Sequence, residues 1–378
     1  MNNTVFIILI VALVLALVGG IIFTVALAAA DWDFSNLDSA QYSTNNYSFD
    51  DSISSITICV LNADVNIVPS TDASTRVVCY EKEKQKHSVS VLDGDLKIDV
   101  LGDLKWYETL FLFSKPKIDI YLPTDNSRRM MIITDTGDIN VCEGFSFDIA
   151  LISGDTSDIS FSGSVESQLK IEVATGDVEV KDTAAADVQI TVSTGDIDIE
   201  NLSCNSLKTI GDTGDLEIDN LTVSGAVNIE RSTGDVAVDT AAVGSLSVKT
   251  DTGDIILGDI SCEDELGVVV STGHTYINNS TAKSFISRGG TGDLNMSDFV
   301  VDGTMNIERS TGDVEFEKCD AGEVYITTDT GHVIGTFLSD KIIFATSSTG
   351  KIDVPKSTVG GKCEITTATG KIVINIAE

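Results

Sequence analysis

Apolar and polar residues alternate along most of this chain in short pairs that recur at a fixed spacing. In each pair, two apolar side chains are separated by one polar residue. A period of two is typical of a β-strand that buries one face, so each pair predicts a short strand. One set of three consecutive pairs is Val188 and Ile190, Ile197 and Ile199, and Leu202 and Cys204.

A glycine marks the same point of every repeat, within the phrase Ser/Thr-Thr-Gly-Asp-Val/Ile. Successive glycines are 19 or 20 residues apart, and Ser157 takes the place of one glycine. A period this regular indicates one structural unit stacked on copies of itself. We expect the glycine to form a corner with a positive φ angle, which other residues resist. The repeat corners are Gly137, Gly176, Gly195, Gly214, Gly234, Gly253, Gly273, Gly292, Gly312, Gly331, Gly350 and Gly370.

Three strands and three corners per repeat predict an all-β fold, a parallel β-helix with apolar side chains stacked inside. About 13 turns of 19–20 residues, spaced by about 4.8 Å, would make a rod about 60 Å long. We assign the repeat to residues 124–378. Residues 53–123 show less regular strand patterns, and we assign them to a β-rich cap over the first turn, because an uncovered end exposes unpaired backbone.

The first 30 residues predict a membrane segment. Residues 5–30 are almost entirely apolar, and as a helix these 26 residues would reach about 39 Å, which exceeds a bilayer core of about 30 Å. A cleaved signal peptide is the alternative, because residues 28–30 resemble a cleavage site. We expect an uncleaved transmembrane helix after a cytoplasmic tail at residues 1–4. A linker at residues 31–52 would then lead to a β-helix on the extracytoplasmic side of the cell membrane.

The formal charge of −34 bears on the partners of the chain. Such a surface repels nucleic acid and anionic lipid head groups, and it attracts divalent cations or basic partners. We therefore expect no nucleic-acid ligand. The N-terminal helix would bind the membrane, and a protein or polysaccharide is the expected surface ligand. The oligomeric state does not follow from the sequence.

An aspartate follows most of the corner glycines, and its purpose is open. Stacked carboxylates about 5 Å apart would repel by about 1 kcal/mol in water. Calcium ions would relieve this repulsion, but splayed side chains, hydrogen bonds to turn amides or solvation would also do so. No other cofactor is expected. The candidate metal ligands are Asp177, Asp196, Asp215, Asp235 and Asp254.

Cysteines and arginines within the repeat are expected to be structural. Four of the seven cysteines fall at inward positions, and free cysteine packs as a small apolar residue. Cys59 and Cys79 lie in the cap, where a disulfide is an alternative. Arg231 and Arg309 occur in two copies of Glu-Arg-Ser-Thr-Gly-Asp. We expect both at a corner, where they offset the acidic column.

The last strand, residues 372–376, is expected to end the chain almost without a covering strand. Such an end would permit end-to-end pairing of two rods.

The sequence gives little support for catalytic residues, because none of the three histidines has a nucleophile motif beside it. Carboxylates are so common that no pair stands out as an acid–base couple.

Several stretches resemble a bacterial family of unknown function whose members carry the name "putative adhesin". Residues 192–197 (Val-Ser-Thr-Gly-Asp-Ile) and 232–236 (Ser-Thr-Gly-Asp-Val) match its repeat, and residues 118–123 and 62–65 resemble its first strands. The resemblance covers about residues 53–378. It implies a membrane-anchored β-helical protein, and the family name implies adhesion. It brings no catalytic residues.

The function we expect is a non-catalytic, adhesin-like or envelope-structural role at the cell surface. One alternative is an extracytoplasmic accessory or sensor component of an envelope-stress system, which altered stress-reporter output on deletion would favour. The other is a polysaccharide-active β-helix enzyme. That alternative requires an activity that disappears when one specific carboxylate is changed.

Overall fold

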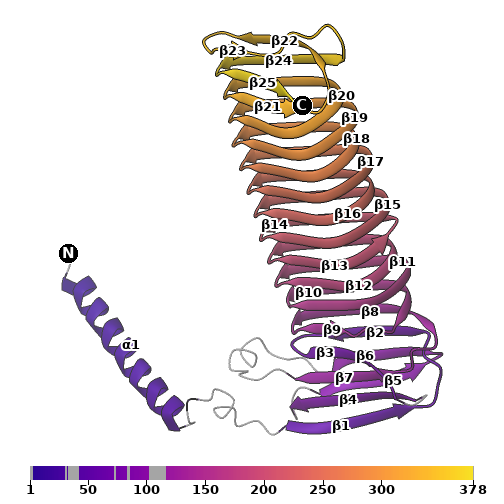
Figure 1. Cartoon of the computed structure of the whole chain (residues 1–378). Coiled ribbons are helices and arrows are strands. Elements are labelled where there is room, and N and C mark those ends of the chain that lie inside the picture. Colours follow the sequence, from indigo (N-terminus) through magenta and orange to yellow (C-terminus); the bar gives the residue numbers. More distant parts are fainter. Residues whose placement is uncertain are drawn as a thin grey trace.

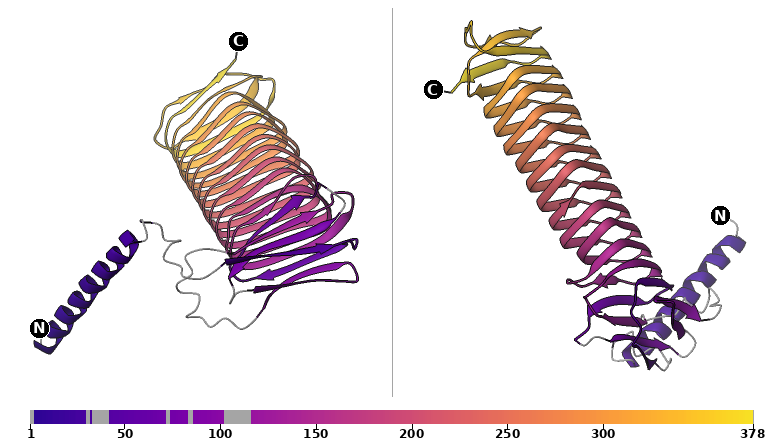
Figure 2. Two further views of the ribbon diagram at one scale, coloured as in Figure 1. Left: turned by 90° about the horizontal axis from the view of Figure 1, so that it is seen from below. Right: turned by 90° about the vertical axis from the view of Figure 1, so that its right-hand side faces the viewer.

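The computed structural model describes residues 3–29, 32, 42–71, 74–82, 86–101 and 116–377. It is an all-β parallel β-solenoid of about 12 turns, close to the 13 expected from the repeat (Figure 1). Figure 2 shows the turns stacked along one axis, each against the next. The fold class predicted from the apolar pairs is therefore confirmed.

Most turns are a single long strand that bends twice, rather than three separate strands. In β16, Val236–Thr252, the alternation of buried and exposed residues changes phase at two points. Seven side chains of this turn point inward, in groups of two, two and three. The three expected pairs are present, and the third gains one more inward position. The strands of the regular turns are β8 Ser127–Thr136, β9 Ile139–Val141, β10 Ser146–Thr156, β11 Ile159–Thr175, β12 Val178–Thr194, β13 Ile197–Cys204, β14 Ser206–Thr213, β15 Leu216–Thr233, β17 Ile255–Thr272, β18 Thr275–Thr291, β19 Leu294–Thr311 and β20 Val314–Thr330.

The first of these bends lies six residues after the corner glycine in eight turns. Thr240 has a φ of 56° there, and Asn220 has the same value. Such left-handed backbone is most tolerable for asparagine and aspartate, which occupy six of the eight turns with this feature. The second bend coincides with a register shift between neighbouring strands, as between Val243 and Leu246. These two bends and the glycine corner give the turn its three sides.

The core is a set of columns in which equivalent residues of successive turns stack in parallel register. Val238 pairs with Leu257, for example, and both side chains are buried. The inward cysteines belong to these columns, and burial raises the pKa of the Cys204 and Cys363 thiols to about 12. All seven cysteines are free, so Cys59 and Cys79 form no disulfide.

The first turn begins earlier in the chain than the predicted boundary of the repeat. Strands β2 (Ser55–Val60) and β3 (Asp64–Pro69) stack directly under β8 and β9. The chain then leaves the solenoid and forms the cap before it returns in β8. In that cap, β6 and β7 pair with the first turn, and β1, β4 and β5 add antiparallel partners. These strands are β1 Tyr42–Phe49, β4 Thr75–Lys82, β5 Lys86–Leu92, β6 Asp95–Leu101 and β7 Lys117–Leu122.

The last strand of the chain is not bare, so that prediction is wrong. Strand β25 (Ile372–Ile376) pairs with β21 (Val333–Phe337) on one side and with β23 (Ile352–Asp353) on the other. In the same way, β24 (Gly361–Thr369) lies between β20 and β22 (Lys341–Ser347). The chain passes outward through β22 and β23, and then returns beneath them. The exposed end of the rod is therefore formed by β22 and β23 (Figure 1).

The N-terminal segment forms helix α1, Asn3–Ala29. Among the residues of α1 whose side chains the structure describes (14–25, 27 and 28), no stretch has the length and apolar character needed to cross a membrane. The transmembrane prediction for residues 5–30 is thus not confirmed. Residues 1 and 2 of the predicted tail and most of residues 31–41 lie outside the described residues. The second half of the predicted linker is ordered as strand β1, Tyr42–Phe49.

Candidate functional site

The corner glycines are required by the close stacking of the turns. Ten of the twelve have φ angles between +126° and +159°. At Gly195, a Cβ atom would also collide with the carbonyl oxygen of Gly176 in the preceding turn. The same collision repeats along the column. These glycines therefore serve the backbone, and they offer no side chain to a ligand.

The corner aspartates form a hydrogen-bonded ladder along the rod. In most pairs of neighbouring turns, Oδ1 of one aspartate accepts from the backbone N–H of the next corner residue. The N–H of Asp196 donates to Asp177 at 2.9 Å, and the N–H of Asp235 donates to Asp215 at 2.8 Å. The ladder begins at Asp64, in the first turn. One oxygen of each carboxylate thus satisfies an amide that the corner leaves without a strand partner.

This ladder accounts for the five candidate metal ligands without a cation. Oδ1 of Asp177, Asp196, Asp215, Asp235 and Asp254 is occupied by an amide of the next turn. Within the described ranges, the column contains no three ligand atoms close enough together to hold a metal ion. Calcium binding by the second carboxylate oxygens stays a prediction.

Two histidines replace aspartates in the ladder and perform the same task. Nδ1 of His274 accepts from the N–H of Asp293 at 3.2 Å, and Nδ1 of His332 accepts from the N–H of Lys371 at 3.0 Å. In both bonds the ring nitrogen is the acceptor, in the place of an aspartate oxygen. Both histidines therefore serve the backbone in this arrangement.

The two arginines lie inside the solenoid, contrary to the prediction that they lie at a corner. Arg231 and Arg309 occupy the inward position three residues before the glycine, and each side chain is only 3% exposed. Nη2 of Arg231 donates to the carbonyl oxygen of Asp215, and Nη2 of Arg309 donates to hydroxyl oxygens of Thr275 and Ser287. Burial lowers the pKa of both guanidinium groups, that of Arg309 to about 10.

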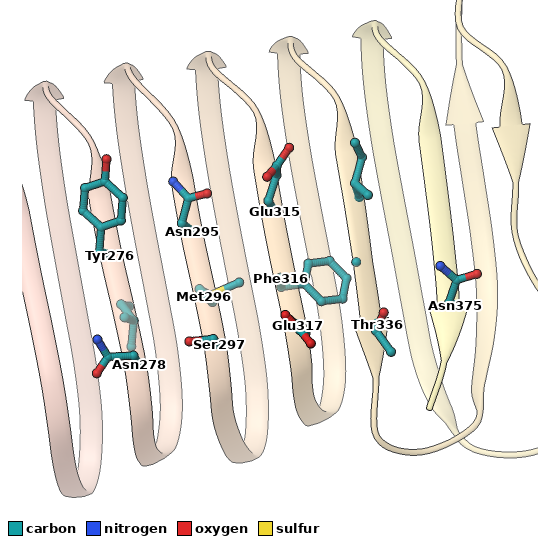
Figure 3. Close-up of a pocket in the computed structure, with 13 residues that line it drawn as sticks. Tyr276, Asn278, Asn295, Met296, Ser297, Glu315, Phe316, Glu317, Thr336 and Asn375 are labelled. Carbon is teal, nitrogen blue, oxygen red and sulfur yellow. The ribbon is translucent and has the colours of Figure 1, made fainter. Parts of the chain in front are cut away.

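A shallow groove of about 470 Å³ crosses the first side of the last turns (Figure 3). Its side chains come from the outward positions three and five residues after the corner glycines. They therefore belong to β18, β19, β20, β21 and β25. The polar lining residues are Tyr276, Asn278, Asn295, Ser297, Glu315, Glu317, Thr336 and Asn375.

One packing detail shapes the floor of this groove. The ring of Phe316 occupies the space that a side chain at Gly335 would fill, and only 6% of Phe316 is exposed. Met296 lies beside it in the same column (Figure 3). The floor is thus apolar and closed, whereas the walls present amides, carboxylates and hydroxyl groups. The phenol of Tyr276 is at one end.

The groove offers hydrogen-bonding groups at a regular spacing. Amides and carboxylates on successive turns, about 4.8 Å apart, can exchange hydrogen bonds with the hydroxyl groups of an extended chain. None of the three histidines lines the groove. Sequence reasoning missed this groove because it followed the inward positions. The signal was present in the run of Tyr, Asn and Glu at one outward position, in Tyr276, Asn295 and Glu315.

The stacked turns and the corner ladder define a repeat protein of the β-solenoid class. The chain belongs to the Toastrack DUF4097 family, whose sequence profile matches residues 53–258 and 239–378. This match confirms that the chain belongs to a family of unknown function, as the resemblance in the sequence indicated. No curated protein matches the chain significantly.

Several solved structures are similar to this chain, and three are described as follows. A protein from Bacteroides fragilis, described as a "putative adhesin", is 13% identical and covers 89% of this chain and 98% of its own, with a TM-score of 0.25. A "putative adhesin" from Parabacteroides distasonis is 11% identical over 87% and 98%, with a TM-score of 0.25. A "putative lipid binding protein" from the same species is 11% identical over 79% and 95%, with a TM-score of 0.20. None of these three is described as an enzyme.

Proposed function

We propose that this chain is a non-catalytic, adhesin-like β-solenoid that binds a polysaccharide in the groove of its last turns. The observation that carries the proposal is the groove itself, where polar side chains follow one another from Tyr276 to Asn375 on five neighbouring strands. An extended polymer can follow this row, since the groups repeat at the strand spacing. The adjacent aromatic ring of Tyr276 offers an apolar face to a sugar ring.

We further propose that helix α1 holds the protein at the cell membrane and that the solenoid lies on the extracytoplasmic side. The nearly continuous apolar sequence of residues 5–30 supports an anchor. The charge of −34 supports a body that stays clear of anionic lipid. The rod would then extend its last turns, which contain the groove, away from its N-terminal attachment (Figure 1).

Binding is tested with the full chain on an array of bacterial and host polysaccharides. We expect one class of polysaccharide to be retained, and we expect binding to weaken at least about tenfold when Tyr276, Asn295 and Glu315 are changed together to alanine. The matched control changes Asp198 and Glu217 to alanine, because both occupy the same outward position in turns far from the groove. Equal binding by both variants, or retention of a protein ligand alone, would contradict the proposal.

The anchor is tested by fractionating cells that express the full chain or a form without residues 1–30. We expect the full chain in the membrane fraction after an alkaline wash, and the shortened form in the soluble fraction. External protease should digest the solenoid on cells whose outer layers have been made permeable and whose cytoplasmic membrane is intact. A full chain that washes off the membrane, or a solenoid that only cell lysis exposes, would overturn this part of the proposal.

A further inference from the structure

Three buried side chains of different chemistry meet inside the N-terminal cap, far from the groove. Cys79 and Glu81 are fully buried, and His87 is 3% exposed. Their potential ligand atoms, a thiol sulfur, a carboxylate oxygen and an imidazole nitrogen, all lie within 4.8 Å of one another. In the part of the chain that the structure describes, no other group of three metal-ligating side chains is this compact.

The alternation of strand β4 explains how this cluster forms. Residues 75, 77, 79 and 81 face inward, so Cys79 and Glu81 are neighbours on one face of the strand. His87 is the first inward residue of β5, which follows β4 in the chain. The three side chains therefore come from two consecutive strands, and they lie beside the apolar core that includes Val77.

Hydrogen bonds already hold the cluster in place. Oε2 of Glu81 is 2.8 Å from Nδ1 of His87 and accepts from the backbone N–H of His87 at 2.7 Å. The other carboxylate oxygen accepts from the side-chain amide of Asn45 on β1. Each partner fixes the orientation of the carboxylate. Such outer contacts are typical of the groups that orient metal ligands.

We propose that Cys79, Glu81 and His87 bind one zinc ion, or a chemically similar divalent transition metal. Thiolate, imidazole and carboxylate are the three ligand types that zinc takes in proteins, and a thiol and an imidazole favour zinc over calcium. On binding, the thiol of Cys79 loses its proton to solvent and forms the Zn–S bond. The imidazole and the carboxylate turn from each other toward the metal.

The proposed ion would join the two sets of cap strands that pair with the first turn of the solenoid. Strand β4 pairs with β1 and with β7, and β7 pairs with β3 of the first turn. Strand β5 pairs with β6, which pairs with β2 of the same turn. A metal held by β4 and β5 therefore joins the two branches of the cap. Since the ion binds only the folded form, it should stabilise the cap.

Cobalt(II) titration of the metal-free full chain, kept reduced, tests the proposal. We expect one cobalt ion per chain and a thiolate-to-cobalt charge-transfer band, which added zinc then removes. Cys79→Ser should abolish the band, and His87→Ala should weaken cobalt binding about 100-fold or more. Cys204→Ser is the matched control, because it removes a buried thiol elsewhere in the core and should leave the band unchanged.

Two outcomes would overturn the proposal. One is a wild-type chain that binds cobalt without the charge-transfer band. The other is a band that survives in Cys79→Ser or disappears in Cys204→Ser. Circular dichroism of each metal-free variant shows whether it is folded. If Cys79→Ser does not fold, alkylation of the wild-type chain decides: zinc must protect Cys79 from the reagent, and an unchanged alkylation rate contradicts the site.

Discussion

The guanidinium group of Arg231 occupies the space that a side chain at Gly211 would fill in the preceding turn. The two residues are register partners in the same inward column, and a Cβ atom at Gly211 would collide with Nη1 of Arg231. Arg309 covers Gly289 in the same way. Most other turns have valine or threonine in this column, and the exceptions are Gly154 and Ser347. A large side chain and a missing one thus compensate each other across neighbouring turns.

This compensation predicts strong coupling between the two positions. Gly211→Val should lower the free energy of unfolding by about 1–3 kcal/mol, because it overpacks the space beneath Arg231. Arg231→Thr should also destabilise, because it leaves a cavity over Gly211. The double variant rebuilds the Val–Thr composition found elsewhere in the column and should recover at least about 1 kcal/mol. Denaturant unfolding of the four proteins measures this, and purely additive losses would contradict the pairing.

The aspartate ladder predicts that the acceptor oxygen matters more than the charge. Asp215→Ala removes the acceptor for the N–H of Asp235 and should cost about 1 kcal/mol of the free energy of unfolding. Asp215→Asn keeps a carbonyl oxygen there and should cost less. Asp212→Ala is the control, since this exposed aspartate lies three residues away in the same corner. If all three variants unfold at the same denaturant concentration, the ladder does not contribute to stability.

The calcium hypothesis makes a separate prediction about the same column. Calcium bound by the second carboxylate oxygens would raise the melting temperature of the full chain, and a chelator would reverse the increase. Changing Asp177, Asp196 and Asp215 together to asparagine should remove the response. A melting curve that millimolar calcium leaves in place would contradict metal binding here, and the hydrogen-bonded ladder would then be the whole purpose of the aspartates.

The sequence revealed those features that depend on local periodicity. Pairs such as Ile197 and Ile199 are apolar at most turns, so the strands and the buried faces could be predicted. The burial of Arg231 could not be predicted, because a charged residue near a corner is normally expected to be exposed. Its burial depends on Gly211, which lies in the preceding turn. A corner near Thr240 was expected, but its left-handed backbone could not be predicted for a related reason. Stacking imposes a φ of 56° there without a glycine to mark it.

The buried cysteines predict a loss of stability in alkaline solution. Burial raises the pKa of Cys204 from 9.0 to about 12, so the folded chain keeps a proton that the unfolded chain releases. Stability from this group is complete below pH 9 and is lost as the pH rises toward 12, by up to about 1.4 kcal/mol per pH unit. Cys204→Ala should flatten this dependence. Val223→Ala is the control, because it leaves a cavity in the same column without removing a thiol. It should lower the free energy of unfolding equally at every pH. Equal dependence of this free energy on pH in all three proteins would contradict the prediction.

The order of the last turns predicts different effects for two isoleucines near the end of the rod. Ile372 lies on β25 between its register partners Val333 and Ile352 and is fully buried, whereas Ile352 lies on the outer strand β23 and is 40% exposed. Ile372→Asp would bury an unpaired carboxylate and should cost about 3 kcal/mol or more. Ile352→Asp should change the free energy of unfolding by less than about 0.5 kcal/mol. Denaturant unfolding measures both effects. If β25 had no outer strand, its inward residues would be less buried, and the two substitutions would then have similar, small effects.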